Sequence, residues 1–183
     1  MPWATDILPN EINTNIEKVK LLQIPNRNRK DALFLGSVYS GVHGNIDELT
    51  KFELGAKNIG IQLLIANSTN IDENSTINLL QQAYITPSIV GTWQKRQGYI
   101  PCRIFKTISY GQLGVTNSKQ VFNIINNLGV YSEDETKLCD KAIECLEHES
   151  SNETIIDAMK IIRDNHTYIN RIESIQFIFR LKQ

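Results

Sequence analysis

The sequence predicts an α+β fold: a single compact domain in which a mostly antiparallel sheet carries about four to five helices. Two strand-like stretches support this prediction, an apolar run at residues 59–66 and an alternating pattern at residues 99–110. The chain has 183 residues, of which 41% are hydrophobic, and this is enough to bury one core. We see no repeat or linker, so we assign residues 1–30 to an N-terminal arm with a basic helix and turn, and residues 31–183 to one globular domain.

The first elements follow from spacing and from proline. Residues 1–10 contain two prolines and are expected to form an arm. Apolar residues at helical spacing predict a helix over residues 11–23, which Pro25 ends. The short apolar run at residues 32–39 predicts a strand.

The middle of the chain is expected to supply the centre of the sheet. Residues 51–57 alternate weakly and are predicted to pair with residues 59–66, whose apolar character on both faces indicates a central strand covered on both sides. Asp72 or Asn74 caps the helix that follows, whose buried stripe contains Ile77, Leu80 and Tyr84. Residues 92–98 are then predicted to form a polar loop.

The last third is predicted to be helical and to end in a strand. Asn117 or Ser118 caps one helix, and a capping-box pattern at Ser132 opens an acidic one. Ser151 is predicted to cap a third helix. Strict alternation over residues 175–181 predicts a strand that returns to the sheet.

Charge is distributed unevenly over a chain whose formal net charge is -1. Residues 1–110 hold eleven Lys/Arg and nine Asp/Glu, a net charge of +2, whereas residues 111–183 hold eight and eleven, a net charge of -3. The front of the chain is therefore the part that can face an anionic partner. The alternative is that these charges are solvated and that Trp93 only covers the core. The candidate contacts for an anionic partner such as a membrane surface are Lys18, Lys20, Arg27, Arg29, Lys30, Trp93, Lys95, Arg96 and Arg103.

Motifs that would indicate catalysis are missing or incomplete. The segment around His43 resembles the His-Gly-Asn segment of calcineurin-like metallophosphoesterases, but Gly41 stands where that family needs an aspartate ligand. Cys139, Cys145 and His148 are too few for a structural zinc site. We therefore predict no enzyme activity, no metal and no cofactor. The unpaired cysteine count and the lack of a signal peptide or membrane-spanning run favour an intracellular protein.

The order of features from Gly41 to Thr116 resembles the globular core of rhabdovirus matrix proteins. The corresponding features are an acidic lead-in, a long strand, a polar turn, an amphipathic helix, a Gly-containing basic loop and a strand with a glycine break, here residues 45–48, 59–66, 67–70, 77–84, 91–99 and 99–111. A helix followed by a terminal strand also ends members of that family. This chain has neither the Lys-rich tail nor the Pro-Pro-x-Tyr motif of many members, and fits best a divergent member from a plant-infecting branch.

The resemblance implies a viral structural protein that self-associates and bridges the nucleocapsid to the inner membrane surface during assembly. Its expected partners are further copies of itself, the viral nucleocapsid and an anionic membrane surface, with no small-molecule substrate. It is expected in the host cytoplasm or nucleus and in the virion. Self-association is assigned to the N-terminal arm, through Pro2, Trp3, Ile7, Leu8 and Pro9.

Two other functions stay open. A soluble interaction or regulatory module would act through the acidic helices after Ser132. An unrecognised hydrolase would require a pocket that unites His43 or His166 with carboxylates.

Overall fold

All the strands in the part of the chain that the structure describes are parallel to their neighbours. The structure, a computed structural model, describes residues 3–21, 31–67 and 71–181. One sheet pairs β1 (Asp31–Leu35) with β2 (Gln62–Ala66). The second has the order β3-β4-β5, with bounds Pro87–Ser88, Val115–Thr116 and Val130–Tyr131.

A parallel bridge between Ala32 and Ile85 joins the two sheets. The backbone N–H of Leu33 donates to the carbonyl of Ile85 at 2.8 Å, two residues before β3 begins. Across the molecule the strands therefore follow the order β2-β1-β3-β4-β5. Parallel neighbours need long crossover connections, and helices supply them here.

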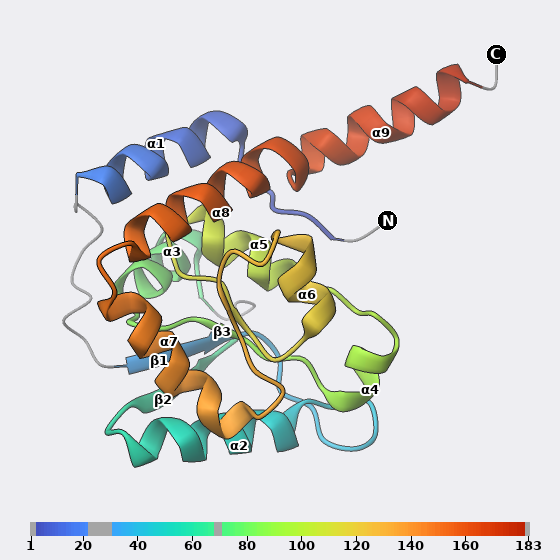
Figure 1. Ribbon diagram of the computed structural model, residues 1–183. Coiled ribbons are helices and arrows are strands. Elements are labelled where there is room, and N and C mark those ends of the chain that lie inside the picture. The colour runs from blue at the N-terminus through green and yellow to red at the C-terminus, as the bar shows by residue number, and fades with distance from the viewer. Residues whose placement is uncertain (1–2, 22–30, 68–70, 182–183) are drawn as a thin grey trace.

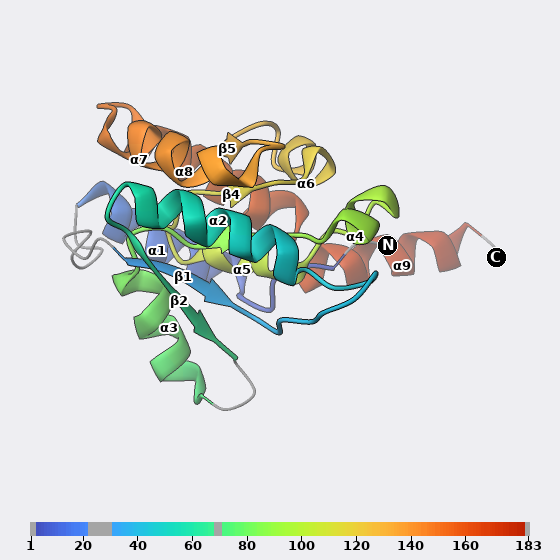
Figure 2. The same ribbon diagram turned by 90° about the horizontal axis from the view of Figure 1, so that it is seen from below.

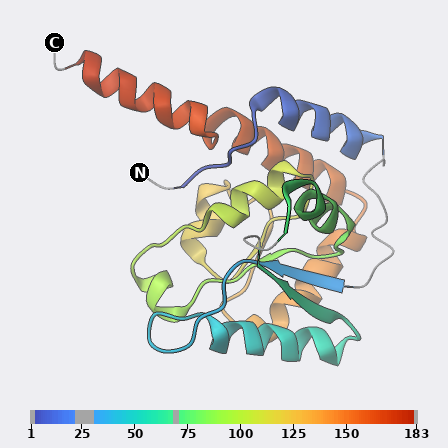
Figure 3. The ribbon, with the colours of Figure 1, turned by 180° about the vertical axis from the view of Figure 1, so that it is seen from behind.

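Helices cover the strands on two sides. In Figures 1 and 2, α2 lies on one side of β1, while α5 lies on the other and is covered by α8 and α1. Figures 1 and 3 show α9 projecting away from the body, with the N-terminal segment beside its first turn. The helices are α1 (Pro9–Lys20), α2 (Ile46–Asn58), α3 (Glu73–Gln82), α4 (Thr92–Arg96), α5 (Cys102–Ser109), α6 (Lys119–Ile124), α7 (Leu138–Glu147), α8 (Ser151–Asn165) and α9 (Tyr168–Arg180), with a 3-10 turn, η2 (Glu135–Lys137).

The core is built around three fully buried phenylalanines. Phe34 is on β1, Phe52 on α2 and Phe105 on α5, so each layer contributes one large ring. Burial of such a side chain stabilises the fold by about 1.5–3 kcal/mol. These rings hold the α2 and α5 layers against β1.

The chain is α+β, as predicted, but the predicted mostly antiparallel sheet with four to five helices is wrong. The described residues form nine α-helices and two small, wholly parallel sheets. Three of these strands have only two residues each. Such strands leave almost no alternating pattern in a sequence.

Two predicted strands are helices. The predicted strand at residues 99–110 contains α5, and the predicted terminal strand falls mostly within α9. In α5, Ile104 and Ile108 are four residues apart, a spacing that fits both a strand face and a helix face. Phe105 decides the question, because its side chain is buried with theirs, as on one face of a helix.

Two predictions about the middle of the sheet also fail, whereas several helices are confirmed. Residues 51–57 lie in α2, and β2 is an edge strand whose Leu64 and Ile65 are exposed. The predicted strand at 32–39 is found as β1, and the predicted helix at 11–23 is found as α1. Asp72 caps α3 by accepting from the backbone N–H of Ser75, and the acidic helix appears as η2 and α7.

A single methyl group should test the contact between α2 and η2. Gly55 lies so close to the carbonyl of Thr136 that an added Cβ would overlap it. Alanine normally stabilises a helix interior relative to glycine. Here we expect Gly55→Ala to lower the free energy of unfolding by about 1–3 kcal/mol, measured by urea denaturation. The control Lys57→Ala, at an exposed position of the same helix, should change it by less than about 0.5 kcal/mol.

Candidate ligand-binding site at the carboxyl ends of the strands

The carboxyl ends of parallel strands all meet at one edge of the molecule. The chain runs outward from β1 to β2 and then returns past β1 to β3, so the connections diverge between β1 and β3. In sheets of this type, ligands bind in the crevice where the connections diverge. The residues that follow β1 are therefore the first place to look for a site.

A cavity of about 470 Å³ opens at the end of β1. Typical ligand pockets have volumes of about 300–1,000 Å³. Its wall comes from the loop after β1, the start of α5, one face of α3, the N-terminal segment, α4 and α9. The lining residues are Ala4, Asp6, Leu35, Gly36, Ser37, Tyr39, Asn45, Thr76, Leu80, Gln94, Tyr99, Pro101, Cys102, Arg103, Lys106, Thr107 and Tyr168.

Arg103 is the cation at the base of this cavity. Its Nη1 donates to the carbonyl of Leu35 at 3.0 Å, and its guanidinium carbon lies 4.0 Å from the ring centroid of Phe34. Burial lowers the pKa of Arg103 to about 10, so the group remains charged at neutral pH. Its Nε is buried and finds no acceptor among the described residues.

Gly36 makes room for that guanidinium. A Cβ at this position would lie 2.5 Å from Nη1 of Arg103, and the φ of Gly36 is 151°. Beyond it, the side chain of Asn45 holds the loop in place. Its Oδ1 accepts from the backbone N–H of Tyr39 at 3.1 Å, and its Nδ2 donates to the carbonyl of Ser37 at 3.4 Å.

Lys106 is the second cation of the cavity and lies one helical turn after Arg103. Its Nζ pairs with Oδ2 of Asp6 at 3.3 Å. The start of α5 lies at the same cavity, and a helix N-terminus favours negative charge. Three phenols, those of Tyr39, Tyr99 and Tyr168, complete the lining, and each is at least partly exposed. Burial raises the pKa of Tyr99, so its hydroxyl remains protonated.

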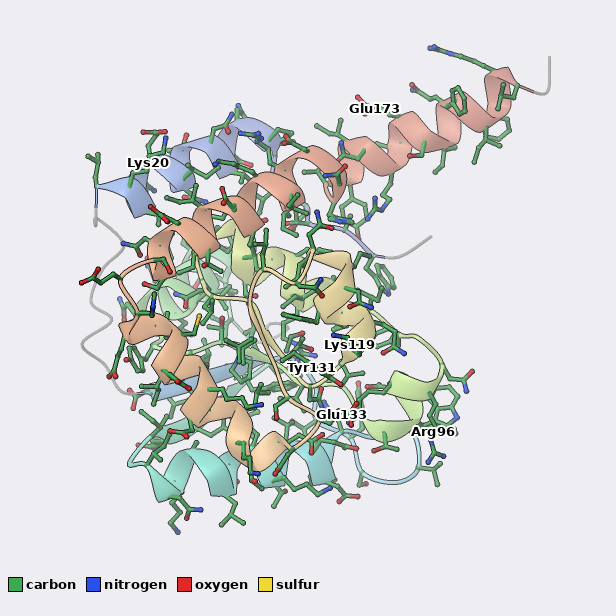
Figure 4. All side chains as sticks on the ribbon, in the orientation of Figure 1. Lys20, Arg96, Lys119, Tyr131, Glu133 and Glu173 are labelled. Atoms are coloured by element: carbon green, nitrogen blue, oxygen red, sulfur yellow. The ribbon has the colours of Figure 1, made fainter. Side chains whose placement is uncertain are left out.

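A second polar cluster at the same edge is internally satisfied. Glu135, which is 4% exposed, accepts from Nδ2 of Asn117 at 2.8 Å and from Nζ of Lys95 at 2.9 Å. Asn117 also binds both the N–H and the carbonyl of Val90. Nearby, Lys119 lies over the ring of Tyr131, whose hydroxyl donates to Glu133 (Figure 4). These groups bind one another, so they fix the loops after β3, β4 and β5, whereas Arg103 has a donor, Nε, without an acceptor among the described residues.

The basic residues predicted to contact a partner are dispersed. Lys18 and Lys20 are on α1, where Lys20 pairs with Glu17 at 2.7 Å. Arg27, Arg29 and Lys30 lie outside the described residues.

The predicted residues after β3 do not form one patch either. Lys95 is engaged with Glu135, whereas Arg96 lies on the outer side of α4 (Figure 4). The rings of Trp93 and His43 pack edge to face, with their centroids 4.3 Å apart. This contact joins α4 to the loop after β1. Of the six predicted contacts that the structure describes, Arg103 is the one that lines the cavity.

The residues assigned to self-association also differ in their exposure to solvent. Trp3 and Leu8 are exposed, whereas Ile7 packs into the core of its own chain. Pro9 begins α1, and Pro2 lies outside the described residues. The arm is bound to its own chain through a parallel bridge between Thr5 and Thr167.

Four residues that line the cavity were not predicted from the sequence: Asp6, Gly36, Ser37 and Lys106. The one local signal was Gly36-Ser37 directly after a buried strand, which is typical of the turn between a strand and a crossover helix. Arg103 and Lys106 were not expected to lie close together, because residues 99–110 were predicted to form a strand. In a strand, positions three apart lie on opposite faces.

Comparisons with protein-family models, curated proteins and solved structures give no match for this chain. Within the described residues, no helix is long and apolar enough to cross a membrane. The same residues contain no cluster of three His, Cys, Asp or Glu side chains arranged to hold a metal ion. Cys139 is buried, Cys145 is half-buried and His148 contacts Ser150.

The Glu135 cluster predicts a pH dependence of stability. Burial alone raises the pKa of Glu135, but hydrogen bonds from Asn117 and Lys95 outweigh it and hold the pKa below its ordinary value. The stabilisation is therefore present above the unfolded pKa of about 4.3 and is lost as the pH falls through the lower folded value. We expect Glu135→Gln to lower the free energy of unfolding at pH 7 by about 1–3 kcal/mol, and to make it less sensitive to acid between pH 5 and pH 3.

Urea denaturation at a series of pH values measures both effects. Glu173→Gln, on the exposed surface of α9, is the matched control and should follow the wild-type curve. Equal acid sensitivity of the wild type and Glu135→Gln would mean that the Glu135 cluster does not contribute in this way.

Proposed function

We propose that this chain binds a phosphate-bearing small molecule in the cavity at the end of β1, and that the ligand is a nucleotide. The observation that carries the proposal is Arg103, a half-buried cation whose buried Nε has no acceptor among the described residues, at the point where the strand connections diverge. A buried donor without an acceptor costs about 1–3 kcal/mol. An anionic ligand would supply the acceptor once the atoms that cover Nε move aside.

Phosphate fits the cationic end of the cavity. A guanidinium offers a planar set of donors that matches phosphate oxygens, and an ammonium adds a mobile charge. Arg103 and Lys106 both line the cavity, and the first turn of α5 adds the positive end of a helix dipole. Gly36 lets the backbone of the loop approach the same point.

A nucleotide accounts for the rest of the lining. Tyr39, Tyr99 and Tyr168 offer aromatic faces for a base, and aromatic side chains commonly stack on flat rings. Ser37, Asn45 and Gln94 offer neutral hydrogen-bonding groups suited to a sugar or a base edge. This proposal differs from the sequence-based expectation that the protein has no small-molecule ligand.

Titration calorimetry with the four common ribonucleoside diphosphates tests the proposal. We expect at least one to bind, and we expect Lys106→Met to weaken that binding by about tenfold, because a charge-assisted hydrogen bond contributes about 1.5–3 kcal/mol. Arg103→Met should weaken it further, with a melting curve to show that the variant is folded. Arg180→Met, a cation at the far end of α9, is the control and should bind like the wild type.

Inorganic pyrophosphate and the free nucleosides separate the two halves of the site. Nucleosides that bind as tightly as their diphosphates, or diphosphate binding that Lys106→Met leaves unchanged, would contradict the phosphate assignment. Binding of none of these ligands to folded protein would exclude the proposed function.

A matrix-like structural role is the second proposal, and the surface of α9 favours it. This helix leaves the body of the molecule (Figure 1), and none of its residues is buried. A helix with apolar residues on all sides is normally covered by other protein or lipid. A second copy of the chain would cover it. The exposed apolar residues at this end are Ile169, Ile172, Ile175, Phe177, Ile178, Phe179 and Leu181.

Sedimentation velocity over a range of concentrations tests this second role. We expect the wild type to self-associate and the double variant Ile175→Glu, Ile178→Glu to remain monomeric, because each glutamate would place a charge in the apolar contact. Glu173→Gln is the control on the same helix. A monomeric wild type that also fails to bind anionic vesicles at low salt would exclude the role.

A further inference from the structure

The N-terminal segment forms one wall of the cavity at the end of β1. The backbone N–H of Thr5 donates to the carbonyl of His166 at 2.9 Å, and the N–H of Tyr168 donates to the carbonyl of Thr5 at 3.0 Å. These two bonds fix the segment at the junction of α8 and α9 (Figure 3). They place the neighbours of Thr5, Ala4 and Asp6, at the cavity.

Asp6 is the one carboxylate among the described residues that line this cavity. It pairs with Lys106 at 3.3 Å, and the two side chains are 56% and 26% exposed, respectively. Lys106 is therefore already neutralised when the cavity is empty. Arg103 is different, because the hydrogen bond of its Nη1 goes to a neutral carbonyl.

The Asp6–Lys106 pair is weak enough for a phosphate to replace. Ion pairs at such partly exposed positions contribute little to stability, and the four-carbon stem of lysine lets its ammonium move. A phosphate group carries more negative charge than one carboxylate and offers more acceptor oxygens. Once Lys106 has turned to the phosphate, the charge of Asp6 is left unpaired beside a second anion and repels it.

We infer that Asp6 limits the affinity of the cavity for its anionic ligand. It holds Lys106 in the empty state and opposes the negative charge of the ligand in the bound state. This inference rests on the proposed function, since it names a residue that sets the affinity of the same site. It also gives the N-terminal segment a role in binding, as the part of the chain that tunes the charge of the cavity.

Replacement of one oxygen by nitrogen tests the inference. Asp6→Asn keeps the shape of the side chain and removes its charge. Titration calorimetry should show that the variant binds a nucleoside diphosphate roughly threefold to tenfold more tightly than the wild type does. The gain should be smaller for the corresponding monophosphate and absent for the nucleoside, because repulsion grows with the charge of the ligand.

Two further variants isolate the mechanism. Asp157→Asn removes an exposed aspartate that pairs with Lys160 on α8 at 2.7 Å, and it should leave binding unchanged. In a Lys106→Met background, Asp6→Asn should give a smaller gain, because the aspartate no longer competes for that lysine.

The outcomes separate the two proposals. If neither the wild type nor Asp6→Asn binds any of the nucleotides, the proposed function fails and this inference fails with it. If the wild type binds a diphosphate and Asp6→Asn binds it equally or more weakly, the inference is overturned and the function stands. An equal gain for the nucleoside would also overturn the inference, since it would show that Asp6 acts through shape and not through charge.

Discussion

Parallel pairing of β1 with β2 on one side, and with Ile85 just before β3 on the other, is the constraint on which the rest of the structure depends. It requires a crossover after each strand, and it brings all the carboxyl ends to one edge. The connection after β1 leads to β2 on one side, and the connection after β2 returns past β1 to β3 on the other side. The two connections diverge at the carboxyl end of β1, which therefore has open space beside it. Phe34 and the carbonyl of Leu35 then hold the guanidinium of Arg103 in that space. The position of the candidate site follows from strand order, and its chemistry follows from one residue of α5.

Two polar clusters share this edge, and their hydrogen bonding distinguishes them. Glu135 receives donors from both Asn117 and Lys95, so its buried charge is compensated within the chain. Arg103 has a buried donor with no acceptor in the described residues. Buried polar groups in folded proteins are almost always paired, so an unpaired one calls for a specific explanation. A saturated network stabilises loops, whereas a cation that lines a cavity and has an unsatisfied donor is suited to an anion that arrives from solution.

The sequence allowed the capped helices to be predicted, because a cap and an apolar stripe are local signals. Asp72 and Ser118 do cap helices, although the periodicity of α5 was misread. β3, β4 and β5 could not be recognised, since two residues carry no period, and their pairing is set by contacts distant in sequence. The candidate site could not be predicted for the same reason, since its residues come from distant parts of the chain. Arg103 was among the predicted contact residues, but as part of a surface patch. Arg103 and Lys106 lie one turn apart on the same side of α5 only because residues 102–109 are helical.

The net charge of the whole chain is a poor guide to a site of this kind. A protein that coats a long polyanion needs many basic residues over its surface, and a formal charge of -1 counts against that. A small anion in a cavity needs only a few charges, since the interaction between charges strengthens as water is excluded. At the end of β1 the lining contains two cations and one carboxylate. The net charge of the cavity depends on residue 6 and on residues 103 and 106, which are far from it in the chain. The composition of the whole chain therefore does not reveal this charge.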